Sequence, residues 1–304
     1  MVVAIHTYIA GDFTSVDGCI RIVFRQLLNC AVPIFLALSG FFLGRKTFQN
    51  RDSVLSFWKK QIPKVYIPCI VWSFPLLLFS ILGGNSVWIQ LGYMIICGFS
   101  IYYFIALVIQ YYILLPFLQK HLKRNLIISM ISSAVTISII TFFFQVKEMS
   151  LPLIFYAGSF LVWFAFYMLG VYYSCIPRNY SLKTSITIVL LGLLLELIEY
   201  TILGGVGIKL SAFIYSFGIV LFILHPRVEA SYKENTYTKI IVYVGKISFA
   251  IYLIHCYIIS ILRKLFVFDS WFLSWLLVSL ITIFIIAIVR GTLPQKVNKY
   301  IGFS

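Results

Sequence analysis

The sequence WFLSWLLVSLITIFIIAIVR, residues 271–290, decides the fold class of this chain. From Trp271 to Val289 it contains no charged side chain. A helix needs about 20 apolar residues to cross the hydrocarbon core of a bilayer, so this stretch is long enough to span a membrane. Similar apolar stretches recur along the whole sequence, which predicts an all-α polytopic membrane protein.

The composition supports a membrane location. The chain has 304 residues, of which 62% are hydrophobic and 11% charged, whereas soluble domains carry roughly 25% charged residues. This excludes a disordered chain and an ordinary cytosolic enzyme. The net charge is +15, but no long basic run points to nucleic acid, so we interpret the positive charge as lying at the membrane edges. The six cysteines are scattered without a C-x-x-C pair, which favours core residues over disulfides or metal ligands.

The apolar stretches predict about ten transmembrane helices in a single integral-membrane domain, residues 1–304. Between the third and fourth stretches, residues 86–99 are too short to span and are expected to lie at the interface. The first stretch would form only about 15 Å of helix, against a core of about 30 Å. We therefore expect the first helix to lack its cytoplasmic half. The expected spans are 1–10, 20–43, 62–83, 100–119, 125–145, 152–174, 184–203, 208–225, 241–262 and 271–290.

The distribution of Lys and Arg predicts the orientation. Most of these residues follow the even-numbered spans, and positively charged short loops stay in the cytoplasm. Both termini are therefore predicted to be cytoplasmic. The cations left for the outer side are Arg21, Lys147, Lys209, Arg263 and Lys264.

Five ionisable residues stand out within the apolar spans: His6, Arg25, Glu196, Glu199 and His255. A charge at the bilayer centre costs about 2.5 to 3.5 kcal/mol, so such residues are functional candidates by default. The predicted topology places all five in the outer half of the membrane. They could form structural polar links or extend to the interface. Alternatively, they form a buried site with a histidine general base, an orienting carboxylate and an arginine that stabilises negative charge.

A basic cluster, Lys59, Lys60 and Lys64, lies at the start of the third span. The preference of positive charge for the cytoplasm explains it without any ligand. Its density would also attract a phosphate-rich ligand that enters from the cytoplasm.

Six sequence motifs occur in a fixed order along the chain. They are VVAIHTY from Val2, CAVPIFLALSGFFL from Cys30, KKQIPKVYIPCIVWS from Lys59, YYFIALVIQYYILLPFL from Tyr102, FAFYMLGVYY from Phe164 and GKISFAIYLIHCY from Gly245. The second motif carries a Val-Pro-x-Phe and Ser-Gly-Phe signature at Val32, Pro33, Phe35 and Ser39–Phe41. Together the six motifs resemble those of the integral-membrane acyltransferases called acyltransferase family 3.

The resemblance implies ten helices and the transfer of a short acyl group, most often acetyl, from acyl-CoA to a glycan hydroxyl. Acyl-CoA would be a co-substrate and not a permanently bound cofactor, and its phosphates would meet the basic cluster. The resemblance also implies that His6 is the catalytic histidine. The enzyme would then belong to a bacterial inner membrane and use a carbohydrate acceptor and no nucleic acid.

In the mechanism that we expect, His6 removes the hydroxyl proton and Glu199 or Glu196 holds the imidazolium. Arg25 lies near the oxyanion, and His255 forms a second polar wall or contacts substrate. An acyl-histidine intermediate is equally compatible with the sequence. The oligomeric state is open.

Two departures from the family keep other functions open. The family usually has an Asp and a basic residue upstream of its histidine, and this sequence begins too late to include them. Two explanations stay open: native residues are missing from the start of the sequence, or the protein is inactive. Where the family often has Arg-x-x-Arg, this chain has Gln61 and Lys64, and lysine keeps the charge but lacks the bidentate fork. The alternatives are a non-catalytic relative and a transporter or flippase for lipid-linked glycans, whose buried charges would line a pathway.

Overall fold

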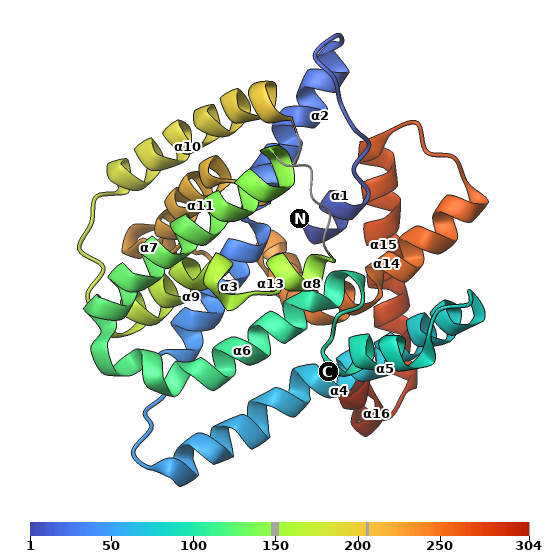
Figure 1. The fold of residues 1–304 in the computed structure, drawn as a ribbon, viewed down its shortest axis with the longest axis horizontal. Helices are drawn as coiled ribbons and strands as arrows, with labels where there is room; N and C mark the ends of the chain where they lie inside the picture. The colour runs from blue at the N-terminus through green and yellow to red at the C-terminus, as the bar shows by residue number, and fades with distance from the viewer. Residues whose placement is uncertain (147–151, 205–206, 304) are drawn as a thin grey trace. The chain divides into compact units, whose positions relative to one another are not determined.

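The chain is built of helices in the computed structural model, which describes residues 1–146, 152–204 and 207–303 (Figure 1). No strand occurs in these three ranges, so the all-α prediction is confirmed. Lys147 and the pair 205–206 lie outside the described residues. The α-helices are α1 (Val2–His6), α2 (Val16–Leu27), α3 (Ala31–Leu43), α4 (Arg51–Leu82), α5 (Val87–Ile95), α6 (Tyr103–Leu118), α7 (Leu122–Thr141), α8 (Leu153–Tyr156), α9 (Phe160–Cys175), α10 (Leu182–Leu203), α11 (Leu210–Ile223), α12 (Pro226–Ala230), α13 (Thr236–Lys246), α14 (Ser248–Leu265), α15 (Trp271–Thr292) and α16 (Gln295–Tyr300).

Six helical stretches in the described ranges are long and apolar enough to cross a membrane. One of them, Ser100–Phe144, has 45 residues and covers two of the expected spans. Two shorter apolar helices, α9 and α11, coincide with two more. The multi-pass architecture is therefore confirmed, with ten as an approximate count. The other five long stretches are Val16–Leu43, Arg51–Leu82, Leu182–Ile202, Ser248–Leu265 and Trp271–Thr292.

Several helix boundaries differ from the sequence prediction; the expected spans 20–43 and 152–174, for example, are divided into α2 and α3 and into α8 and α9. Helix α4 begins at Arg51, well before residue 62, because Asn50 and Ser53 cap its N-terminus: Ser53 N donates to Asn50 Oδ1 at 2.9 Å, and Asn50 N donates to Ser53 Oγ at 3.3 Å. The expected span 241–262 is divided in two, since α13 ends at Lys246 and α14 begins at Ser248. A capping box formed by Asn235 and Thr238 begins α13.

The contacts divide the chain into two compact units. Unit 1 comprises Met1–Arg21, Lys59–Ile109 and Lys233–Ser304, and unit 2 comprises Ile22–Trp58 and Gln110–Tyr232. We describe each unit separately.

Unit 1 is built around α14. One cluster joins Tyr102, Leu253, Ile254 and Ile286, all nearly inaccessible to solvent, and the Tyr102 hydroxyl donates to the Leu253 carbonyl at 2.8 Å. A second cluster contains Val3 of α1. These two clusters fix the faces of α14 and thereby the direction in which its polar residues point.

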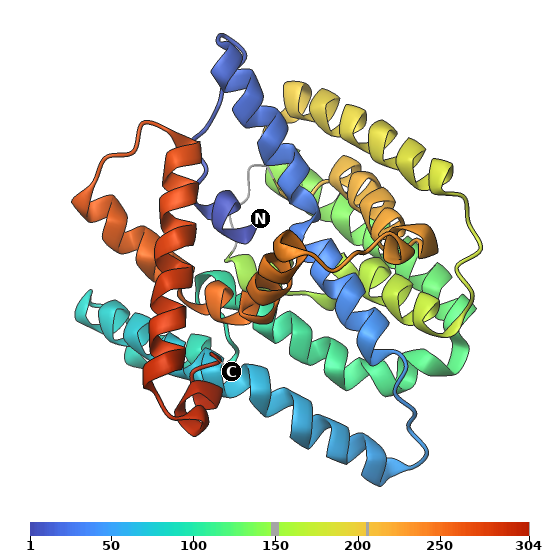
Figure 2. The same cartoon turned by 180° about the vertical axis from the view of Figure 1, so that it is seen from behind.

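Unit 2 is a group of closely packed apolar helices (Figures 1 and 2). Helix α9 runs along α3, and the backbones meet at Gly40 and Gly170. A Cβ at Gly170 would lie 1.9 Å from the Ala37 carbonyl oxygen, and one at Gly40 would lie 2.3 Å from the Tyr167 carbonyl oxygen. Only glycine fits at these positions, as is typical of helix packing in membranes, where small residues allow close approach. This contact gives a physical reason for the Ser-Gly-Phe signature.

Candidate active site

His6 ends the short helix α1, which packs against α14 and α15 within unit 1. Val3 is 6% exposed and contacts Ile258, Leu262 and their neighbours in one apolar cluster. Trp271 Nε1 donates to the Ala4 carbonyl at 3.0 Å, and the Arg263 guanidinium donates to the His6 carbonyl at 3.1 Å. These contacts hold the backbone of His6 against two long apolar helices.

The His6 ring faces His255 of α14. Their ring centroids are 5.2 Å apart, with the planes tilted by 45°. His255 is completely buried, and its Nδ1 lies 3.0 Å from the Ile251 carbonyl and 2.8 Å from the Tyr252 carbonyl. A carbonyl can only accept a hydrogen bond, so we assign the proton of the neutral ring to Nδ1. Nε2 of His255 therefore keeps its lone pair, and it lies 3.5 Å from Cys256 Sγ.

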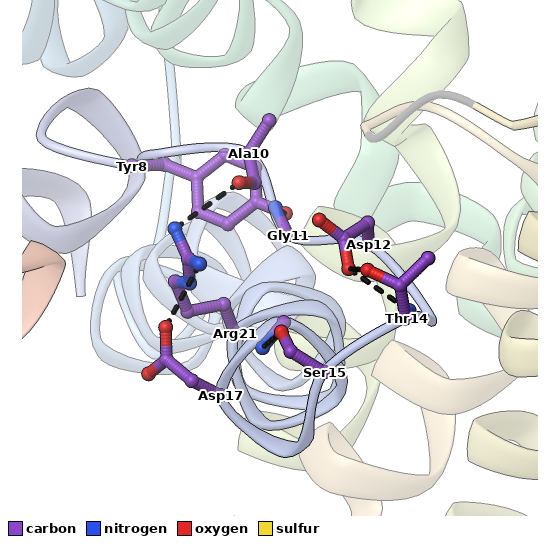
Figure 3. A network of polar contacts seen from close by, with 9 residues as sticks. Tyr8, Ala10, Gly11, Asp12, Thr14, Ser15, Asp17 and Arg21 are labelled. Atoms are coloured by element: carbon purple, nitrogen blue, oxygen red, sulfur yellow. Dashed lines mark hydrogen bonds and ion pairs between the residues drawn. The ribbon is translucent and has the colours of Figure 1, made fainter.

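The segment that follows His6 is ordered by local polar contacts (Figure 3). Arg21 pairs with Asp17 at 2.8 Å and donates to the Ala10 carbonyl at 3.2 Å. Asp12 accepts hydrogen bonds from the Thr14 hydroxyl and the Thr14 amide, and these bonds lower the pKa of its carboxyl. Arg21 of α2 thus holds the segment 7–15, which connects α1 to α2, against the helix that follows it.

A second polar group lies in unit 2, where α2 supplies Arg25 and α10 supplies Glu196. Arg25 Nη1 donates to Asn29 Oδ1 at 2.5 Å, and Asn29 Nδ2 donates both to Gln26 Oε1 at 2.9 Å and to the Glu196 carboxylate. Arg25 is 6% exposed and Glu196 is 0% exposed. Glu196 Oε2 and Gln26 Nε2 have no hydrogen-bond partner within the described part of the chain. The hydrogen-bonding capacity of these two buried atoms is therefore unused within the described residues.

Glu199 and Lys209, in the same unit, form hydrogen bonds with residues that are near them in the sequence. The Glu199 carboxylate accepts hydrogen bonds from the Ser211 amide at 3.3 Å and from the Ser211 hydroxyl, so it links α10 to the start of α11. Lys209 is 1% exposed, and its ammonium donates to the Gly204 carbonyl at 2.9 Å. Lys209 is one of the cations predicted for the outer side of the membrane, and in the structure its side chain is buried.

The basic cluster lies on α4, and Lys59, Lys60 and Lys64 are all exposed. Lys64 Nζ lies 3.5 Å from Gln61 Oε1. The three ammonium groups belong to unit 1, as do His6 and His255.

Comparison with known proteins identifies the family. The family described as "Acyltransferase domain" matches residues 1–291. The chain belongs to this acyltransferase family. Neither the curated proteins nor the solved structures gave a significant match. The protein is thus a membrane acyltransferase, and the match agrees with the resemblance to acyltransferase family 3. The match does not specify the acyl donor or the acceptor.

The structure of this acyltransferase brings together some of the predicted residues. His6 meets His255 in unit 1, and Arg25 is linked to Glu196 through Asn29 in unit 2. Sequence reasoning missed Asn29, although it lies one helical turn after Arg25 in an apolar span, which is itself a signal for a buried polar partner. The roles assigned to the five residues stay predictions.

We expect Asn29→Ala to destabilise unit 2, because it removes the amide that joins the buried guanidinium to the buried carboxylate. Leaving such groups unsatisfied costs about 1 to 3 kcal/mol in unfolding free energy. Chemical unfolding in detergent measures the change, with Asn85→Ala as a control, since Asn85 is exposed near the end of α4. Equal stability of the two variants would contradict the bridging role.

Proposed function

We propose that this protein transfers an acetyl or other short acyl group from acyl-CoA to a hydroxyl of a cell-surface carbohydrate. We further propose that it works in a bacterial plasma membrane with both termini in the cytoplasm. The observation that carries the proposal is the pair His6 and His255, held among apolar helices in a chain of the acyltransferase family. A histidine is the side chain best suited to proton transfer near neutral pH.

In the proposed reaction, His6 takes the proton from the acceptor hydroxyl as the oxygen attacks the thioester carbonyl. The carbon–sulfur bond then breaks, and the imidazolium returns the proton to the leaving thiolate, which gives the ester and free CoA. His255 faces His6 with its protonated Nδ1 held by carbonyls, so it can orient the catalytic ring. This role makes His255 a positioning residue.

The polar group of unit 2 is suited to a carbohydrate. Arg25, Asn29 and Glu196 form a buried hydrogen-bonded chain, and the unpartnered Gln26 Nε2 and Glu196 Oε2 offer one donor and one acceptor. Sugar hydroxyls both donate and accept hydrogen bonds, and buried polar atoms require such partners. Glu199 links the same group to α11 within unit 2.

The exposed lysines on α4 are proposed to bind the phosphates of acyl-CoA. Replacing Lys59, Lys60 and Lys64 by Gln should raise the KM for acetyl-CoA about 10-fold or more, since each exposed charge contributes about 0.5 to 1 kcal/mol. We expect kcat to change little. Acetyl-pantetheine lacks the nucleotide phosphates, so its KM should not respond.

The matched control for this prediction replaces Lys296 and Lys299, two exposed lysines of α16, by Gln. If the α4 variant and the α16 variant change the KM for acetyl-CoA equally, the lysines of α4 do not bind the donor.

Release of free CoA tests the proposed function itself. Purified protein in proteoliposomes should release CoA thiol from acetyl-CoA only when a surface-glycan extract is added, because hydroxyl acceptors are consumed in the reaction. A thiol reagent follows the release. Glycan movement across the vesicle without any use of acetyl-CoA would favour a flippase, and no turnover of either kind would favour a non-catalytic relative.

A further inference from the structure

Cys256, the residue next to His255, adds a thiol to the histidine pair. One ligand atom each from His6, His255 and Cys256 lie within 4.8 Å of one another. His255 is buried, and the other two side chains are partly buried. The sequence alone predicts a core residue at Cys256, because the six cysteines are scattered without a C-x-x-C pair.

We propose that His6, His255 and Cys256 form a binding site for a thiophilic divalent cation, with Zn²⁺ as the expected ion. Two imidazoles and a thiolate are ligands that Zn²⁺ prefers, and three protein ligands leave a fourth position open. The proposal goes beyond the acyl-transfer reaction and does not depend on it.

The distances between ligand atoms fit tetrahedral coordination. With Zn–N of about 2.0 Å and Zn–S of about 2.3 Å at a tetrahedral angle, the nitrogen and sulfur ligands of one ion lie about 3.5 Å apart. His255 Nε2 and Cys256 Sγ are already 3.5 Å apart. His6 has to close from at most 4.8 Å to about 3.3 Å from the other nitrogen, which a rotation of its side chain can supply.

The hydrogen bonds of His255 also match those of a metal ligand. A ligating histidine usually donates its other N–H to a carbonyl or carboxylate, which fixes the ring and its tautomer. His255 Nδ1 donates to the Ile251 and Tyr252 carbonyls, which leaves the Nε2 lone pair for an ion, and Nε2 lies 3.5 Å from Cys256 Sγ. Arg263 of α14 donates a hydrogen bond to the His6 carbonyl, so it holds the backbone of His6 against the helix that carries His255 and Cys256. Binding would release the proton of the Cys256 thiol.

Occupancy would block acyl transfer, a consequence that rests on the proposed function. A bound cation would use the lone pair with which His6 accepts the hydroxyl proton. The site would therefore act as an inhibitory or protective site for the histidine pair.

Cobalt titration tests the site without any acyl donor or acceptor. The purified protein in detergent should bind one equivalent of Co²⁺, with a thiolate-to-cobalt charge-transfer band and the d–d bands of tetrahedral coordination. Zn²⁺ should displace the Co²⁺ and abolish both signals. Cys256→Ser should remove the charge-transfer band and weaken binding at least about 100-fold, given that even outer partners of a ligand contribute 10- to 100-fold.

Two further variants make the result specific. His6→Ala should also weaken Co²⁺ binding by at least about 10-fold, whereas Cys175→Ser, which changes an exposed cysteine of unit 2, should leave it unchanged. Binding that survives in Cys256→Ser, or the absence of saturable binding in the wild-type protein, would overturn the proposal. Neither result would bear on acyl transfer, which is measured separately.

Discussion

Replacing His6 by Ala should reduce acyl transfer by a factor of about 10² to 10⁴ while the protein remains folded. General-base catalysis contributes a factor of this size, and no other residue of α1 can accept a proton in its place. His6 is only partly buried, and Val3 and Ala4 make the buried contacts of α1, so loss of the imidazole leaves the helix anchored. Initial rates of CoA release, with folding checked by size-exclusion chromatography, measure the effect.

His121→Ala is the matched control for this variant, because His121 lies in an exposed turn of the other unit. We expect its rate to equal that of the wild type. If both histidine variants retain full activity, His6 is not the base.

Replacing Gly170 by Leu should lower the free energy of unfolding by about 3 kcal/mol or more. A Cβ at this position would lie 1.9 Å from the Ala37 carbonyl oxygen and 2.8 Å from the Phe41 nitrogen. Both are backbone atoms of α3, so the two helices must separate to make room. Unfolding by a denaturing detergent, followed by tryptophan fluorescence, measures the loss.

Gly291→Leu is the control for the packing prediction. A Cβ at Gly291 meets no atom within 4 Å, and the position is helical. Leucine is the better helix former, so the stability of this variant should stay within about 1 kcal/mol of the wild type. Equal stability of the two leucine variants would show that α3 and α9 do not meet at Gly170.

Most of the helical architecture could be predicted because hydropathy sets where an apolar helix can lie. Residues 271–290 became α15 with little change, and 184–203 became α10. The start of α4 was missed because the cap formed by Asn50 and Ser53 is a local polar signal outside the apolar stretch. The division at Ile247 was missed because Gly245, Lys246 and Ser248 interrupt the stretch 241–262 only briefly, and the residues on both sides of them are apolar.

The sequence could single out the candidate residues, but it could not show which of them contact one another. Hydropathy identified His6, Arg25, Glu196 and His255 as costly residues in apolar helices, whatever they contact. Helices that are apolar on all sides give no periodicity that fixes which face points inward. The pairing of His6 with His255, and that of Asn29 with Glu196 on a distant helix, could therefore come only from the structure.

The chemical identity of the product tests the central claim most directly. Proteoliposomes would receive ¹³C-acetyl-CoA and a surface-glycan extract, and the carbohydrate would be examined by mass spectrometry before and after mild alkali. We predict a labelled acetyl group on the carbohydrate that alkali removes as expected for an oxygen ester. Carbohydrate that crosses the vesicle membrane unlabelled, or that stays unmodified while acetyl-CoA remains intact, would contradict the assignment as an O-acyltransferase.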